Sequence, residues 1–195
     1  MNKILTSENS PLRIDTIKLP GRLGRIGMTL CPGKKDSGQL GKFWDRDLGS
    51  DLAVISAWGA KASVTLMEGF ELDMLGVATL PALCRERNIE WHHMPIRDLD
   101  VPDDTFEAKW EITGCRLREI LTDGGNVLLH CRGGIGRTGT IAARLLVELG
   151  FEPLHAITMV RKTRPGTIET TAQEQYVLRL KKWPRHAALL REFVA

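Results

Sequence analysis

The chain has 195 residues, of which 43% are hydrophobic and 26% are charged, and its formal net charge is +3. These values are typical of one globular domain with a sizeable core, and they do not indicate a disordered chain. The small excess of positive charge suits an anionic substrate but does not indicate nucleic-acid binding. The N-terminus lacks the apolar core of a signal peptide, and no apolar run approaches the roughly 18–20 residues that cross a membrane. We therefore expect a cytoplasmic protein that binds neither nucleic acid nor a membrane.

The first half of the sequence begins irregularly and then alternates between strands and helices. Residues 1–50 are rich in Gly and Pro; within them RIGMTL is a candidate strand, whereas Gly33–Gly41 indicates a loop. Ser50 or Asp51 is the expected N-cap of the first helix. The other elements expected in this half are a strand over 62–67, a helix over 78–88 with a proline in its first turn, and a strand over 89–96.

The second half continues this alternation. A long amphipathic helix is expected over 103–125, where apolar side chains recur at helical spacing between N-terminal carboxylates and a final Gly-Gly pair, and where Gly114 is a candidate for a kink. The alternation predicts an α/β fold: a single domain with a mostly parallel central sheet flanked by helices on both faces. The remaining expected elements are a strand over 126–130 and helices over 137–150, 152–162 and 171–183.

The expected domain occupies most of the chain. No repeat and no linker divides the sequence. We assign residues 26–185 to the domain, 1–25 to an N-terminal extension and 186–195 to a C-terminal tail.

The sequence LLHCRGGIGRTGT, residues 128–140, lies between an apolar strand and an amphipathic helix and allows two interpretations. As G-x-G-x-x-G it is a dinucleotide fingerprint, with Glu152 near the offset expected of a ribose-binding acid. However, too little chain follows to complete such a nucleotide-binding sheet, Arg137 has no role in its turn, and the Gly-Lys-Ser/Thr of a Walker A loop is absent. As Cys131 followed by Arg137, the same stretch is a phosphate-binding loop with its own nucleophile.

The second interpretation uses more of the residues. Backbone N–H groups at the start of a helix carry partial positive charge, and together with Arg137 they stabilise the thiolate of Cys131, which is the nucleophilic form. The planar guanidinium of Arg137 can bind two phosphoryl oxygens at once. Thr138 is placed to donate a hydrogen bond to the sulfur, and His130 is expected to order the loop rather than to transfer protons. The plain alternative is a buried cysteine and a surface arginine on a glycine-rich turn.

HCRGGIGRTG resembles the H-C-x5-R-[ST]-G signature of cysteine-dependent protein tyrosine and dual-specificity phosphatases. The match fixes the cysteine, the arginine, the following hydroxyl and the strand–loop–helix setting together. The resemblance implies the fold of that family, a Cys131 nucleophile, a cysteinyl-phosphate intermediate, and no metal or cofactor. The residues that it implies for binding phosphate or another oxyanion are Arg132, Gly133, Gly134, Ile135, Gly136 and Arg137.

A tyrosine phosphatase also needs an acid that protonates the leaving group. The sequence Asp98-Leu99-Asp100-Val101-Pro102 matches half of the family's W-P-D-x-x-V-P loop, and it follows an expected strand. We assign the acid to Asp98 and hold Asp100 in reserve. Asp103 and Asp104 are expected to cap the next helix instead.

Residues 163–177, TRPGTIETTAQEQYV, resemble the segment after the signature helix in the kinase-associated phosphatase-like branch, where R-x-G-x-I-x-T precedes a Gln. Gln173 matches that Gln, which helps to position the hydrolytic water in relatives, and Glu169 stands where relatives often have Gln. The alternative for Gln173 is a polar residue in the first turn of the last helix. The order of elements resembles the same branch.

The expected function is hydrolysis of phosphate monoesters on a phosphorylated protein, with the preference among phosphotyrosine, phosphoserine and phosphothreonine left open. One alternative is a phosphatase of phosphoinositides or other small phosphoesters, although lipid-directed relatives tend to carry lysines in the loop and this loop adds only Arg132. Another alternative is a non-catalytic phosphoprotein-binding module, which would need a damaged cysteine, arginine or acid.

The cysteines are scattered and include no C-x-x-C pair, so reduced thiols are expected. Under oxidation, Cys84 or Cys115 is a candidate disulfide partner of Cys131. A buried structural cysteine is the alternative for each.

Overall fold

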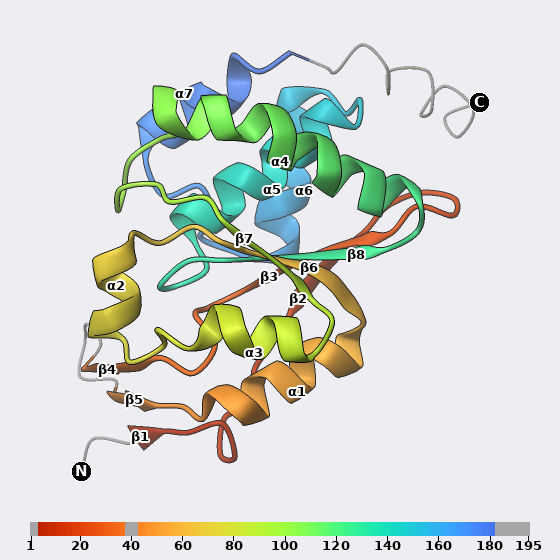
Figure 1. The fold of residues 1–195 in the computed structure, drawn as a ribbon. Coiled ribbons are helices and arrows are strands. Elements are labelled where there is room, and N and C mark those ends of the chain that lie inside the picture. The colour runs from red at the N-terminus through yellow and green to blue at the C-terminus, as the bar shows by residue number, and fades with distance from the viewer. Residues whose placement is uncertain (1–3, 38–42, 182–195) are drawn as a thin grey trace.

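The computed structural model describes residues 4–37 and 43–181. Its main sheet has five strands in the order β2-β3-β8-β6-β7 (Figure 1). Strand β2 is antiparallel to β3, and every other pair of neighbours is parallel. The expectation of a mostly parallel sheet in an α/β fold is therefore confirmed. The strands are β2 (Asp15–Lys18), β3 (Arg25–Thr29), β6 (Ala60–Thr65), β7 (Glu90–His93) and β8 (Asn126–His130).

Helices cover both faces of this sheet (Figure 1). One face carries α4 (Asp104–Thr122), α5 (Gly136–Glu148), α6 (Pro153–Thr163) and α7 (Thr171–Leu178), and the other carries α1 (Leu48–Trp58) and α3 (Leu80–Glu86). None of the helices in the described ranges is both long enough and apolar enough to cross a membrane.

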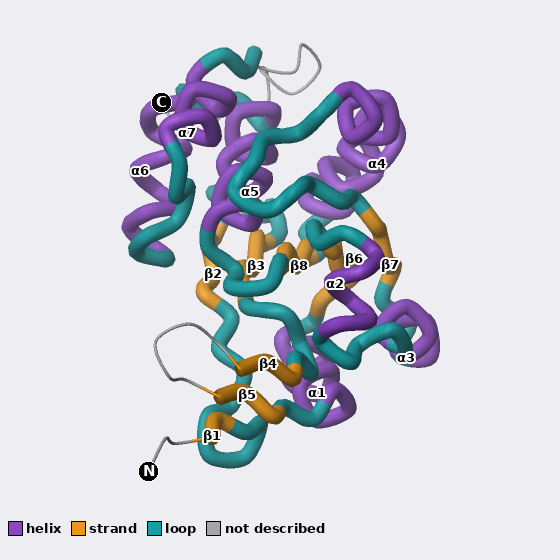
Figure 2. Tube along the Cα trace, turned by 90° about the vertical axis from the view of Figure 1, so that its left-hand side faces the viewer, coloured by secondary structure: helices purple, strands orange, loops and turns teal. Residues whose placement is uncertain are grey.

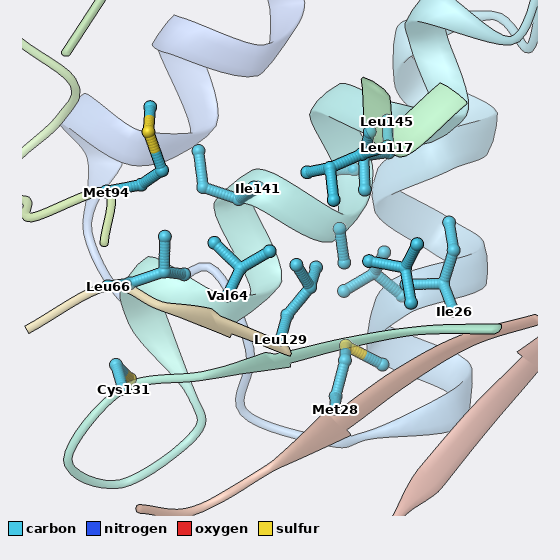
Figure 3. Packing of buried hydrophobic residues seen from close by; sticks show 14 of the residues in the cluster. Ile26, Met28, Val64, Leu66, Met94, Leu117, Leu129, Cys131, Ile141 and Leu145 are labelled. Atoms are coloured by element: carbon cyan, nitrogen blue, oxygen red, sulfur yellow. The ribbon is translucent and has the colours of Figure 1, made fainter. Parts of the chain in front are cut away.

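Strand β8 shows why its sequence is apolar throughout. Val127 and Leu129 belong to the larger core cluster, which includes Ile141 of α5, whereas Leu128 packs in the smaller cluster with α1 and α3. Since both faces of the strand are buried, it reads as an uninterrupted apolar run instead of an alternating one. Figure 3 shows the larger cluster reaching Cys131, where the chain leaves the strand.

A second, smaller sheet lies beside the main one (Figure 2). It consists of β1 (Ile4–Leu5), β5 (Phe43–Asp45) and β4 (Lys35–Ser37) in that order. The loop expected over Gly33–Gly41 is therefore wrong at β4, and residues 38–41 lie outside the described part. The sequence Lys-Asp-Ser has no apolar alternation, and its strand depends on pairing with β5, Lys35 opposite Asp45.

Two helices differ from expectation in ways that local contacts explain. Helix α1 begins at Leu48, and its N-cap is Asp47, whose side chain accepts a hydrogen bond from Ser50 N at 2.6 Å. Asp51, one of the two expected caps, is buried. Helix α4 runs unbroken through Gly114, where a Cβ would lie 2.5 Å from Trp110 Nε1. This glycine therefore serves close packing within a continuous helix.

The domain boundaries remain a prediction. Strand β2 belongs to the segment expected as an extension, yet it forms one side of the main sheet. The expected tail, 186–195, lies outside the described residues.

The parallel strands end at one level. Thr29 is opposite His130, His130 is opposite Thr65, and Thr65 is opposite His93. The loops that follow β3, β6, β7 and β8 therefore leave the same end of the sheet. In α/β proteins this carboxyl end is where ligands bind.

Candidate active site

The loop between β8 and α5 surrounds the Cys131 sulfur. Cys131 is only 3% exposed, and the N–H of Gly134 donates to its Sγ at 3.2 Å. Gly134 has φ +71°, and a Cβ there would lie 2.2 Å from Thr29 O, so this position requires glycine. Helix α5 begins at Gly136, which places the loop at the positive end of that helix.

Arg164 holds the loop from outside. Its Nε and NH2 donate to the carbonyl oxygens of Gly134 and Gly133 at 2.6 and 3.0 Å, and its NH1 donates to Asp15 Oδ2 at 2.6 Å. In a trans peptide unit the C=O and N–H groups point in opposite directions. Fixing these two carbonyls outward therefore turns the next two N–H groups toward the inside of the loop. Arg164 is the first residue of the R-x-G-x-I-x-T motif, and the motif alone indicates no role for it.

Arg137 is buried among acceptors from three segments. It donates to both carboxylate oxygens of Glu71 at 2.6 and 2.9 Å, and to Ile96 O at 3.1 Å. Its NH2 also lies 2.9 Å from Asp98 Oδ1. Burial alone would lower the pKa of Arg137, but the hydrogen bonds that it donates to Glu71 and the nearby negative charges outweigh burial and raise the pKa, so the guanidinium stays charged.

Glu71 is the main residue of this site that the sequence analysis missed. It lies in α2 (Gly69–Met74), the short helix after β6, and also accepts from Glu68 N in a capping box. A capping box is a local signal that the sequence does offer. The contact with Arg137, 66 residues away, has no local signal.

The aspartates after β7 have separate environments. Asp98 has a 60% exposed side chain and faces the cavity with Arg137. Asp100 turns its carboxylate back to its own loop, where Oδ1 accepts from Val101 N at 2.8 Å. Asp103 is the N-cap of α4, as expected, and accepts from Phe106 N at 2.8 Å. Of the two candidate acids, Asp98 is therefore the one brought to Arg137.

His130 lies beneath the loop and is fully buried. Its Nε2 is 2.8 Å from Thr65 Oγ1, which also accepts from Trp91 Nε1 at 2.9 Å. Burial and, after it, the charge of Arg137 lower the pKa of His130 to about 3. The ring is neutral at physiological pH, and its hydrogen bond ties β8 to β6.

Thr138 and Gln173, two further residues predicted to act in catalysis, are buried. The Oγ1 of Thr138 has no hydrogen-bond partner within the described residues, so the bond expected from it to the Cys131 sulfur is not formed in this structure. Gln173 accepts from Glu169 N at 2.9 Å and donates to Asp100 O at 3.2 Å, so it joins the start of α7 to the acid loop. Its amide also lies against the phosphate loop, 3.0 Å from where a Cβ of Gly136 would be. In these contacts it bridges two loops, and the carboxylate of Glu169 lines the cavity.

The cavity at the mouth of the loop has a volume of about 310 Å³. It brings together the phosphate loop, the acid loop, and residues of the small sheet that the sequence analysis left without a role. The Arg132 guanidinium also lines the cavity, but it is already paired, since it donates to both carboxylate oxygens of Asp36 at 2.9 and 3.0 Å. The residues that line the cavity are Lys34, Asp36, Trp44, Asp98, Leu99, Cys131, Arg132, Gly133, Ile135, Arg137 and Glu169.

The other cysteines are spread over the fold. Cys84 packs in the cluster on the far face of the sheet, and Cys115 is exposed on α4. Cys31 lies beside the loop, where its N–H donates to Arg132 O at 3.4 Å. The described residues contain no group of three or more His, Cys, Asp or Glu side chains placed to hold a metal ion.

Comparison with known proteins assigns this loop to a family. The model of the Swiss Army Knife protein, DSP-PTPase phosphatase domain (PTP-SAK), matches residues 48–177. Cyclin-dependent kinase inhibitor 3 of Rattus norvegicus is 33% identical over 157 residues, which are 78% of this chain and 69% of that protein. The Homo sapiens protein is 30% identical over 183 residues, which are 89% of this chain and 80% of that protein.

Solved structures of phosphatases are also similar to this chain. Kinase associated phosphatase (KAP), with its catalytic-site cysteine substituted by serine, has a TM-score of 0.74 and 26% identity, covering 86% of this chain and 93% of that one. Tk-PTP in its active form has a TM-score of 0.59 at 26% identity, covering 86% and 95%. The resemblance expected from the sequence around Cys131 is confirmed: the chain belongs to the DSP-PTPase phosphatase family and is a homologue of cyclin-dependent kinase inhibitor 3.

Proposed function

We propose that this protein hydrolyses phosphate monoesters on phosphorylated proteins through a cysteinyl-phosphate intermediate. The observation that carries the proposal is that Cys131, the charged Arg137 and Asp98 line the same cavity. Family membership and the identity to cyclin-dependent kinase inhibitor 3 support the same activity.

In the first step, the Cys131 thiolate attacks phosphorus and forms an S–P bond as the ester P–O bond breaks. The non-bridging oxygens are bound by the inward N–H groups of the loop and by Arg137, which stabilise the charge of the transition state. Glu71 holds Arg137 from behind and so orients its donors. Asp98, in its acid form, gives its proton to the departing oxygen.

In the second step, Asp98 accepts a proton from water as the water oxygen attacks phosphorus. The S–P bond breaks, inorganic phosphate forms and the thiolate returns. Thr138 donates a hydrogen bond to the departing sulfur. Gln173 takes part in placing the water and, through Asp100 O, the acid loop. His130 stays neutral and keeps the loop in place.

The first prediction concerns the nucleophile. We expect Cys131→Ser to lower kcat on an aryl phosphate and on a phosphotyrosine peptide by about 10³-fold or more, because a serine hydroxyl is not ionised at neutral pH. Binding of the peptide, measured by titration calorimetry, should remain.

Cys115→Ser is the matched control, since Cys115 is exposed on α4 and outside the cavity. Full turnover by Cys131→Ser would refute the proposed function. Equal losses in both variants would show that the protein had been damaged in general.

A further inference from the structure

Three cations line the cavity, and two of them are matched by carboxylates. Arg137 binds both oxygens of Glu71, and Arg132 binds both oxygens of Asp36. The third cation is Lys34, in the segment between β3 and β4. No role for it follows from the mechanism above.

Lys34 is only 5% exposed, yet its ammonium group donates no hydrogen bond to any residue that the structure describes. The carboxylate oxygen recorded beside it, Asp36 Oδ2, is 3.9 Å away, which is beyond hydrogen-bond range. Both oxygens of Asp36 already accept from Arg132. The Lys34 ammonium lies over the Trp44 ring, 4.6 Å from its centre.

An ammonium group has three donors, and Lys34 lines the cavity from which a ligand would approach it. Burial lowers the pKa of Lys34, and Asp36 offsets only part of this effect. An anion that enters the cavity would supply the missing acceptors. Because Lys34 and Cys131 line one cavity, a single ligand can place its phosphoryl group at the loop and another anionic group at Lys34.

Building on the proposed function, we propose that Lys34 and Trp44 form a subsite for a second anionic group of the substrate. The ligand that fits is a phosphopeptide with a carboxylate or a second phosphate on the residue beside the phosphorylated one. A polyphosphoinositide fits less well, since it would bring several phosphates toward the one cation of the cavity that donates no hydrogen bond to a carboxylate.

The test measures binding of three phosphotyrosine peptides to the full chain carrying Cys131→Ser, by titration calorimetry. The peptides differ in the residue beside the phosphotyrosine, which is alanine, glutamate or phosphothreonine. We expect at least one of the two charged peptides to bind about tenfold more tightly than the alanine peptide, as a charge-assisted hydrogen bond would give. The glutamate and phosphothreonine peptides show whether a carboxylate or a phosphate is preferred.

Adding Lys34→Met should remove this preference, and Lys34→Arg should retain much of it. Lys35→Met is the matched control: Lys35 is the next residue, is exposed and pairs with Asp45 at 2.7 Å, so the preference should persist. Thermal melting of each variant shows that the fold is intact.

Three results with the peptides would overturn the proposal: equal binding of all peptides, a preference that survives Lys34→Met, or an equal loss for all peptides in Lys34→Met. The last would mean that Lys34 supports the loop itself. Tighter binding of a soluble phosphoinositide headgroup than of any peptide would also overturn it. Because the readout is binding to an inactive protein, failure here is distinguishable from failure of the proposed function, which is judged by turnover.

Discussion

Arg137 is the residue at which most contacts of the candidate site meet. It connects the phosphate loop to α2 through Glu71 and to the acid loop through Asp98 and Ile96 O. Two bonds to one carboxylate fix the plane of a guanidinium more firmly than a single bond would. A phosphoryl group that enters the loop therefore meets donors whose direction is already set, which lowers the cost of ordering them.

At the same scale, the two candidate acids can be separated. Asp98→Asn should lower kcat by about 10²–10⁴-fold on phosphotyrosine peptides, because the leaving oxygen loses its proton donor. The loss should be smaller on p-nitrophenyl phosphate, whose leaving group needs less protonation. Steady-state kinetics across a series of aryl phosphates would measure this dependence.

Asp100→Asn is the control for that series, since the Asp100 carboxylate caps its own loop. A steeper dependence on the leaving group in Asp100→Asn than in Asp98→Asn would reassign the acid.

His130 makes folding stability depend on pH. Its pKa is lowered to about 3 in the fold, whereas an unfolded histidine titrates near 6.5. Below about pH 6.5 the unfolded chain binds a proton that the folded chain does not, so this residue costs stability as the pH falls toward 3. Between pH 7 and pH 5 the cost is about 2 kcal/mol.

Urea unfolding of the wild type and of His130→Gln at the two pH values would measure this effect. We expect the wild type to lose about 2 kcal/mol more than the variant on acidification. Parallel losses in the two proteins would show that His130 does not titrate in this way.

At the scale of elements, the stretch from the end of α6 to the first turn of α7 braces both catalytic loops. Arg164 holds two carbonyls of the phosphate loop, and Gln173 holds Asp100 O of the acid loop. The two contacts come from residues only nine apart in the sequence. One short segment therefore sets the positions of the loops relative to each other.

Arg164→Met tests this bracing. We expect kcat/KM to fall by roughly 10- to 100-fold and inhibition by vanadate to weaken, because released carbonyls allow the loop amides to turn away from the ligand. Arg179→Met, an equal change of charge at an exposed position on the C-terminal side of α7, should keep activity near that of the wild type. An unchanged loop affinity in Arg164→Met, with a normal melting temperature, would argue against bracing.

For the molecule as a whole, the parallel sheet explains which parts could be predicted. The strand β8, its loop and α5 were predictable because apolar runs, glycines and helical periodicity are all local signals. Asp98 followed from a short motif after β7. Glu71 reaches Arg137, and Asp36 and Lys34 reach the cavity, because the loops after the parallel strands leave the same end of the sheet. No spacing in the sequence encodes these contacts. The cap at Asp47 was missed because Ser50 and Asp51 offer the same chemistry within four residues.

The ion pair between Arg164 and Asp15 has a consequence for how much of the chain the activity needs. Asp15 opens the first strand of the main sheet and precedes residues 48–177, the stretch shared with the family model. A shortened protein trimmed to that stretch would lack the anchor of the arginine that shapes the anion-binding turn. A fragment that keeps this anchor therefore has to start at or before residue 15.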